Sequence, residues 1–294
     1  MTSPVWARRR AAAGRVWREF AANRGGLVGV VVLGLFVLTA ILAPLLISES
    51  SLDVTRATGQ RLESPSGDFP LGTDENGLSV LTLTLWGTRL SLVVGLAAAV
   101  LSVLIGTTVG ILAGHFGGWL SAVLLRFTDF FLIMPSLVLA IALSAVLEGG
   151  AGTIILAIGV VSWPTSARLV RAQTLAVEAR PYIERARALG GGHGHVIFKH
   201  VLPSVLPLVF VNTTLAVGTA IVAESTLRFL GLGSTSEITW GGLLRSASSS
   251  GAITYGAWWY LLPPGIAIVL LVLAFTLVGR ALETVLNPKL RERR

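Results

Sequence analysis

The sequence has no cysteine and few charged residues for its length. Of its 294 residues, 13% are charged and 53% are hydrophobic, and the mean hydropathy is +0.77. The lack of cysteine excludes a disulfide framework and any metal or redox chemistry that needs a thiolate. Soluble chains carry about a quarter charged residues, so the shortage of charge excludes an ordinary soluble domain. We therefore predict an all-α protein that crosses a membrane several times.

The sequence also lacks the motifs of nucleotide hydrolysis and of metal-dependent catalysis. Its two lysines, Lys199 and Lys289, do not complete the G-x-x-x-x-G-K-[ST] pattern of a P-loop. His115 and the three histidines within 193–200 form no HExxH pattern, so we interpret them as polar surface residues and expect no metal site. The isoelectric point is 11.1, but no basic stretch carries the interleaved aromatic residues of a nucleic-acid site. We expect neither catalysis nor nucleic-acid binding by this chain.

Long apolar runs follow one another along the chain. Six of them predict transmembrane helices, of which the fourth is the shortest and contains Pro164. The first run is too long for the apolar core of a signal peptide, so we expect it to remain as a membrane span. The six runs cover residues 26–47, 90–114, 120–147, 153–167, 203–222 and 258–278.

Charge sets the predicted orientation of these spans. Most of the 23 Lys and Arg residues lie near the two ends of the chain and in 168–202. The positive-inside rule therefore places both termini and this loop in the cytoplasm. The predicted segments are a basic N-terminal segment 1–25, a first helix 26–47, an outer loop 48–89, a core domain 90–280 with five helices, an inner loop 178–203, an outer loop 224–257, and a cytoplasmic tail 281–294.

Small residues and prolines within the runs predict how the helices pack and bend. Gly106, Gly110 and Gly114 form a small-xxx-small ladder, which lets another helix backbone approach closely. Pro135 and Pro164 each remove an intrahelical hydrogen bond, so we expect a kink at both.

A basic, partly helical segment between the fourth and fifth runs is the most informative part of the sequence. Pro181 suits a first helical turn, and residues 182–189 predict two turns that end at three glycines beginning with Gly190. A second short apolar and basic piece, 196–202, precedes Pro203. The pattern predicts an elbow made of a helix, a glycine hinge and a second helix. On composition alone it also suits a basic amphipathic helix resting on anionic lipid.

The elbow carries a family pattern. Its E-x-A-x-x-x-G run, which starts at Glu184, resembles the EAA loop of bacterial ABC importer permeases, although Arg185 stands where that family usually has alanine. The resemblance implies a coupling helix that docks into a cytoplasmic ATPase subunit. The residues it marks for coupling are Tyr182, Ile183, Glu184, Ala186, Leu189, Gly190, Ile197, Leu202 and Pro203.

Three further stretches resemble the dipeptide, oligopeptide and nickel branch of these permeases. Residues 71–77 resemble its Leu-Gly-Thr-Asp-Glu-x-Gly signature, and 223–233 resemble its Ala-Glu-Ser-x-Leu-x-Phe-Leu-Gly-Leu-Gly segment. Residues 17–24 resemble the opening of the C-type subunit. Departures occur at 78–79, where the branch continues Arg-Asp, and at 287–289, where it often has Asp-Pro-Arg. The outer-loop signature residues are Gly72, Thr73, Asp74, Glu75, Glu224 and Ser225.

This resemblance implies that the chain is one subunit of a transporter with several different subunits. The fold would be the type I importer bundle of six helices, lodged in the lipid of a bacterial cell membrane. Its partners would be a homologous B-type permease, one or two cytoplasmic ATPase subunits that carry ATP and Mg, and an extracytoplasmic solute-binding protein. The solute would be a peptide or a related small molecule. The chain itself would bind no cofactor. No residue of the spans identifies a substrate-binding position.

Arg126 and Asp129 are the clearest ionisable residues inside a run. Their i, i+3 spacing allows them to neutralise each other on one helix face, so we predict a structural ion pair. Intramembrane charges also occur in ion-coupled carriers, which keeps a stand-alone carrier or channel open as an alternative. A membrane scaffold without transport activity is a third hypothesis.

Overall fold

The computed structural model describes residues 14, 17–147 and 149–286. Within this part of the chain five helices are long and apolar enough to cross a membrane, and a bent helix pair raises the number to six if it is counted as one span. The predicted all-α membrane fold is confirmed. The five are α2 (Arg24–Leu46), α3 (Val80–His115), α6 (Ala151–Glu178), α9 (Leu202–Phe229, continuous with His193–Val201 before it) and α11 (Trp258–Leu286).

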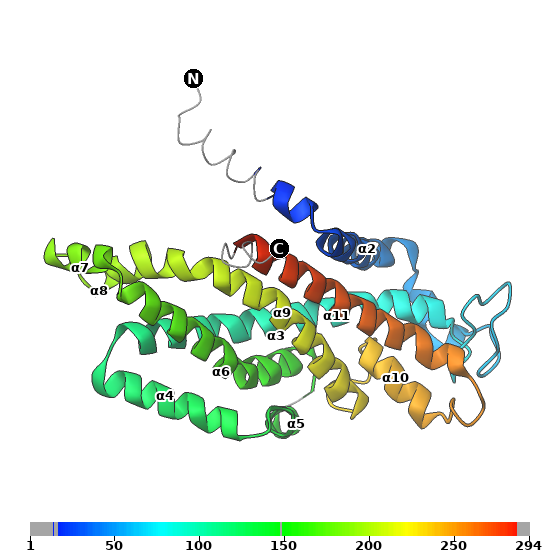
Figure 1. Ribbon diagram of the computed structural model, residues 1–294. Coiled ribbons are helices and arrows are strands. Elements are labelled where there is room, and N and C mark those ends of the chain that lie inside the picture. The colour runs from blue at the N-terminus through cyan, green and yellow to red at the C-terminus, as the bar shows by residue number, and fades with distance from the viewer. Residues whose placement is uncertain (1–13, 15–16, 148, 287–294) are drawn as a thin grey trace.

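The long helices lie alongside one another, and the connections gather at the two ends of the bundle (Figure 1). Helix α3 packs against α6 and α9, while α11 packs against α9 and α2. One end carries α7 (Pro181–Ala188), α8 (His193–Val196) and the π-helical segment η3 (Ile197–Val201). The opposite end carries η1 (Glu49–Leu52), η2 (Val54–Arg56) and α10 (Trp240–Ser249).

The third predicted run is not one kinked helix. It forms α4 (Gly118–Ile133) and α5 (Ser136–Val146), which are bent by 90° relative to each other. Met134 between them is extended, because the residue before a proline is driven out of the helical region, and Pro135 has no N–H to continue the ladder. Pro164 behaves differently, since α6 continues through it.

Two helices begin or end away from the predicted boundaries. Helix α3 starts at Val80 rather than at residue 90, with the Ser79 hydroxyl accepting from the Thr82 N–H at 3.4 Å. The loop predicted over 48–89 is therefore shorter. Helix α6 ends at Glu178 rather than at residue 167. In both cases polar residues lower the hydropathy without ending the helix. Most of the predicted segment 1–25, and residues 287–294 of the predicted tail, lie outside the described residues.

The glycine ladder of α3 acts as predicted. A Cβ at Gly106 would lie 2.7 Å from the Trp163 carbonyl oxygen, and one at Gly110 would lie 2.6 Å from that of Ala167. Both oxygens belong to α6, so the two backbones meet without intervening side chains. This contact makes α3 and α6 a tightly joined pair that leads from one end of the bundle to the other.

Candidate functional site

Residues 180–202, here called the elbow, form a hydrogen-bonded turn at one end of the bundle. Pro181 opens α7 at the first helical position, where its missing N–H has no partner to lose. Gly190 has φ +85°, and its N–H donates to Arg187 O at 3.0 Å. The Gly191 N–H donates to Ala186 O at 2.9 Å. These two bonds with a left-handed glycine form a Schellman cap. The glycines predicted to form a hinge therefore cap α7 and set the direction of the turn.

An apolar cluster seats the elbow on the helix ends. Ile183 of α7 is fully buried and packs with Val170 and Val177 of α6. Val196 and Val201, which lead into α9, belong to the same cluster. Predicted coupling residue Ile183 thus faces the bundle itself. Because η3 continues into α9, the segment from 193 onward is one long helix and Pro203 begins no new one.

Four polar side chains, one from each of four helices, form contacts that connect the elbow to the ends of α3 and α6. His115, at the end of α3, contacts Glu178 through Nδ1 at 2.5 Å and His193 through Nε2 at 2.9 Å. Arg187 of α7 donates to the second Glu178 oxygen at 2.5 Å. The His115 side chain is fully enclosed, so its interpretation as a surface residue is wrong. We call these four residues the clamp.

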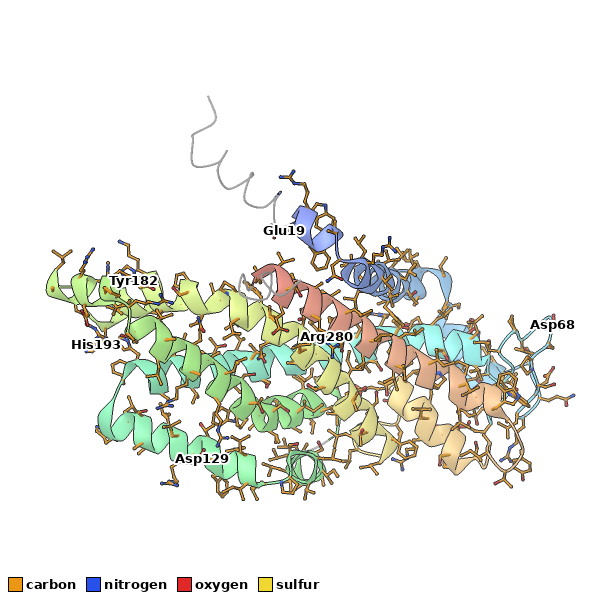
Figure 2. All side chains as sticks on the ribbon, viewed as in Figure 1. Glu19, Asp68, Asp129, Tyr182, His193 and Arg280 are labelled. Atoms are coloured by element: carbon orange, nitrogen blue, oxygen red, sulfur yellow. The ribbon has the colours of Figure 1, made fainter. Side chains whose placement is uncertain are left out.

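The outward face of the elbow exposes large apolar side chains. Leu189 is 88% exposed, Phe198 72% and Tyr182 44%. Figure 2 shows Tyr182 and His193 together at this end of the bundle and Asp68 at the other. Of the remaining predicted coupling residues, Glu184, Gly190 and Pro203 are exposed, whereas Ala186, Ile197 and Leu202 are partly buried. Phe198 was missed by sequence reasoning, because it lies in the second helical piece and outside the family pattern.

At the opposite end of the bundle, the residues of the first signature, 71–77, form a hydrogen-bonded loop. Gly72 has φ +64°, and the Thr73 hydroxyl donates to Gln60 O at 2.5 Å and accepts from the Glu63 N–H at 2.8 Å. Asp74 Oδ1 accepts the backbone N–H groups of Asn76 and Leu78, each at 2.8 Å. Burial raises the pKa of Asp74, although these two N–H groups act to lower it. Thr73 and Asp74 are buried, while Glu75 is partly exposed.

The second signature builds a buried ionic network beneath that loop. Glu224 and Arg228 are almost completely buried on α9, with Nε and Oε1 3.7 Å apart. Arg228 also pairs with Glu237, whose other oxygen accepts from the Ala151 N–H at the start of α6 at 3.2 Å. The Ser225 hydroxyl donates to Glu224. Loop 57–79 together with residues 224–257 is here called the cap, and this network ties it to α6.

The predicted ion pair inside the third run is wrong. Asp129 Oδ1 accepts from Arg168 of α6 at 2.6 Å, and no ion pair joins it to Arg126, which is exposed. The i, i+3 spacing placed two charges on one helix, but the longer α6 brings a competing arginine across the helix pair. The Asp129 side chain is 38% exposed, so its pairing is a surface contact.

With this geometry described, comparison with known proteins identifies the class. The chain belongs to the family of binding-protein-dependent transport system inner membrane components, which its residues 106–292 match. Residues 13–65 match the N-terminal transmembrane domain of oligopeptide transport permease C. It is thus a multi-span permease subunit of the ABC importer class, as the resemblance of its elbow and signatures implied.

Individual relatives cover nearly the whole chain. It is 37% identical over 280 residues to a dipeptide transport system permease protein of Alkalihalophilus pseudofirmus, covering 94% of this chain and 90% of the relative. It is also 37% identical to a di/tripeptide transport system permease protein of Pseudomonas aeruginosa, covering 94% and 91%. An oligopeptide transport system permease protein of Bacillus subtilis is 34% identical, covering 94% of this chain and 91% of the relative.

Proposed function

We propose that this chain couples ATP hydrolysis on separate cytoplasmic ATPase subunits to the import of dipeptides or short oligopeptides. The names of its relatives support the peptide substrate. In this proposal the ATPase subunits, one or two per complex, bind ATP and Mg, and this chain contributes no residue to the nucleotide. Both termini and the elbow lie in the cytoplasm of a bacterium, as the distribution of basic residues favours.

The observation that carries the proposal is the exposed apolar tip of a firmly held elbow. Leu189 and Phe198 offer apolar area in the way that a helix presents anchors to a groove on a partner. A side chain left 88% exposed on a Schellman-capped turn gains nothing for the isolated chain. An ATPase cleft that encloses Leu189 would bury it, and Glu184 and Arg185 would lie at the rim of the contact.

A force applied to the elbow has a direct path into the bundle. The clamp and Ile183 connect α7 to the ends of α3 and α6, and η3 leads without interruption into α9. Closure of the ATPases would therefore move α6 and α9 together. The cap, at the far end of both helices, is where we place the contact with an extracytoplasmic solute-binding protein. A homologous B-type permease completes the passage.

The test is co-purification together with ATP-driven uptake by the assembled importer. Leu189→Asp should release the ATPase subunits and abolish uptake, because a carboxylate cannot enter an apolar cleft without a large desolvation cost. The matched control is Ile253→Asp, which changes an apolar side chain of the cap that is 69% exposed. It should retain the bound ATPase, because the cap lies at the end of the bundle opposite the elbow.

Two alternatives predict other outcomes. If the elbow only rests on lipid, Leu189→Asp leaves the ATPase bound, and the coupling role is refuted. If the chain is a stand-alone ion-coupled carrier, the purified chain alone moves solute in liposomes, and Asp129→Asn stops it. The pairing of Asp129 with Arg168 at the surface gives no support to such a relay.

A further inference from the structure

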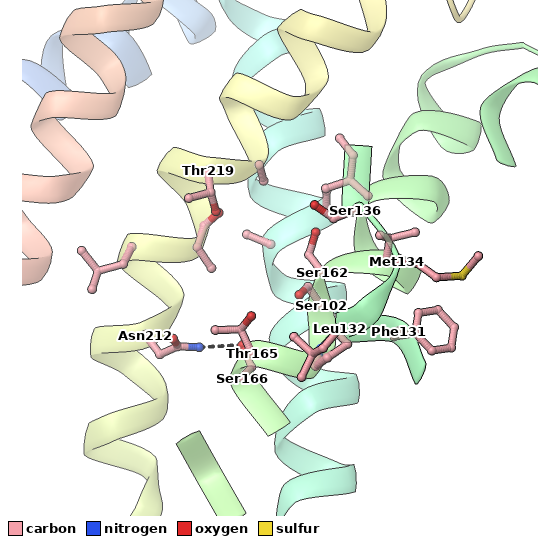
Figure 3. A pocket seen from close by; sticks show the side chains of 18 of the residues that line it. Ser102, Phe131, Leu132, Met134, Ser136, Ser162, Thr165, Ser166, Asn212 and Thr219 are labelled. Carbon is pink, nitrogen blue, oxygen red and sulfur yellow. Dashed lines mark hydrogen bonds between the residues drawn. The ribbon is translucent and has the colours of Figure 1, made fainter. Parts of the chain in front are cut away.

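A cavity of about 590 Å³ lies in the middle of the bundle, between α3, α6, α9 and the break that separates α4 from α5 (Figure 3). Its walls are formed by small and apolar residues, among them Ala98, Ile158 and Ala216. None of the described residues that line it is ionisable. The 90° bend between α4 and α5 lies at its wall, where Met134, Pro135 and Ser136 line the cavity.

Hydroxyl groups in the spans are of two kinds, those bonded within their own helix and those with no partner, and the second kind includes Thr84, Thr107, Ser144 and Thr174 outside the cavity. Threonines of the first kind, such as Thr108 and Thr213, donate to a carbonyl four residues back in their own helix, at 2.9 and 2.8 Å. That is the usual way in which a hydroxyl is satisfied in an apolar environment. Within the described chain, the cavity hydroxyls with no hydrogen-bond partner are that of Ser102, which is buried, and those of Ser136, Ser162 and Thr165, which are exposed.

Asn212 adds a fixed amide to these free hydroxyls. Its Nδ2 donates to Ser166 Oγ at 2.8 Å, a bond drawn in Figure 3. This bond orients the amide and leaves its carbonyl oxygen available as an acceptor. The cavity therefore offers acceptors and donors from α3, α5, α6 and α9, without a charge of either sign.

From this arrangement we propose that the cavity is a solute-binding site of this chain on the import path. It holds the amide groups and termini of a short peptide by neutral hydrogen bonds, and it gives no counter-charge to the peptide's side chains. The site rests on the proposed function and specifies its selectivity: passage through this half of the importer is insensitive to side-chain charge. A buried charge, in contrast, would select for the opposite one.

The first test introduces a charge into the cavity. The complete importer, reconstituted with its partner subunits, is assayed with Ala-Ala, Lys-Ala and Asp-Ala, and each rate is divided by the wild-type rate for the same dipeptide. Ser162→Asp should lower the relative rate for Asp-Ala about tenfold below that for Lys-Ala, by charge repulsion at short distance inside the cavity. Ser162→Asn, of equal size and no charge, should leave the three ratios equal. Equal ratios in Ser162→Asp would overturn the proposal.

The second test covers the case in which the charged variant does not assemble. Because the chain has no cysteine, Ser162→Cys introduces its only thiol. A charged methanethiosulfonate reagent should modify it in the active importer, and saturating Ala-Ala should slow the reaction about tenfold at full occupancy. Thr108→Cys, on the outer surface of the membrane-spanning helix α3 and outside the cavity, should not react, because lipid excludes the charged reagent.

The two proposals fail separately. An active importer in which the thiol at position 162 never reacts refutes the cavity site alone. A wild-type importer that takes up none of the three dipeptides refutes the peptide substrate, and the labelling still shows whether a hydrophilic molecule reaches the cavity.

Discussion

The two ends of the bundle use similar residues for opposite purposes. At the elbow, the clamp of His115, Glu178, Arg187 and His193 lies behind a surface whose apolar side chains stay exposed. At the cap, the network around Arg228 is buried together with the signature residues that form it. Both regions match family patterns, so a pattern alone does not distinguish a contact surface from a structural constraint. Burial distinguishes them.

The glycines of the two ends show the same difference. Gly190 is left-handed, and a Cβ added to it would meet no neighbouring atom, so its role is conformational. Gly233 is also left-handed, but a Cβ there would lie 2.6 Å from the Arg228 guanidinium. At the elbow a glycine sets the turn of an exposed surface, whereas at the cap a glycine makes room for the chain's own ionic network.

The largest expected effect comes from breaking the Schellman motif that ends α7 in the elbow. Gly190→Val forces a β-branched residue into φ +85° and should abolish uptake while membrane insertion stays intact. The matched control is Gly192→Ala, because Gly192 has φ −71° and open space around it. It should transport normally. Uptake at the wild-type rate by Gly190→Val would show that the elbow's geometry is not used for coupling.

Breaking the cap's network should reduce stability instead of coupling. Arg228→Met leaves Glu224 and Glu237 without their cation and should destabilise the folded subunit by about 3–5 kcal/mol. The measurement is the denaturation midpoint of the purified importer. Arg56→Gln is the control, because the pair of Arg56 with Asp53 is on the surface and its loss should change nothing measurable. An unchanged midpoint in Arg228→Met would contradict the structural role.

The clamp should have an intermediate effect, on coupling more than on folding. His115→Leu removes the contact with Glu178 and His193 and should lower uptake about tenfold, a loss of about 1.4 kcal/mol in coupling. ATP hydrolysis should fall less, so more ATP is consumed per peptide. His195→Leu, in the same elbow but outside the clamp, is the control. A parallel fall of uptake and hydrolysis would reduce the clamp to a purely structural element.

The sequence predicted the elements better than their junctions. Pro181 and the glycines at 190–192 marked both ends of α7, because these residues have specific backbone preferences. Pro135 marked the break after α4, but the 90° angle depends on how α5 packs, which no local pattern contains. His115 and Glu178 are 63 residues apart, so only the fold brings them together. The ion pair of Arg228 with Glu224 could have been predicted, because the i, i+4 spacing of the two residues on a helix is visible in the sequence.

The smallest effect concerns the loop of the cap and tests whether Asp74 is purely structural. Asp74→Ala removes the acceptor of the Asn76 and Leu78 N–H groups and should cost about 1–3 kcal/mol, seen as faster hydrogen exchange at Leu78. Asp74→Asn keeps an acceptor oxygen and should exchange slowly. Because burial raises the pKa of Asp74 above 3.8, ionisation disfavours the folded loop.

The sign of the pH dependence follows from that shift. The contribution of Asp74 to stability is complete below the ordinary pKa and decreases as pH rises through the raised one, whereas Asp74→Asn lacks this decrease. Subtracting the pH profiles of the two proteins isolates the carboxyl group. If Asp74→Asn also loses uptake while its loop stays protected from exchange, Asp74 contacts something outside the chain, and the contrast between an exposed elbow and a self-contained cap no longer holds.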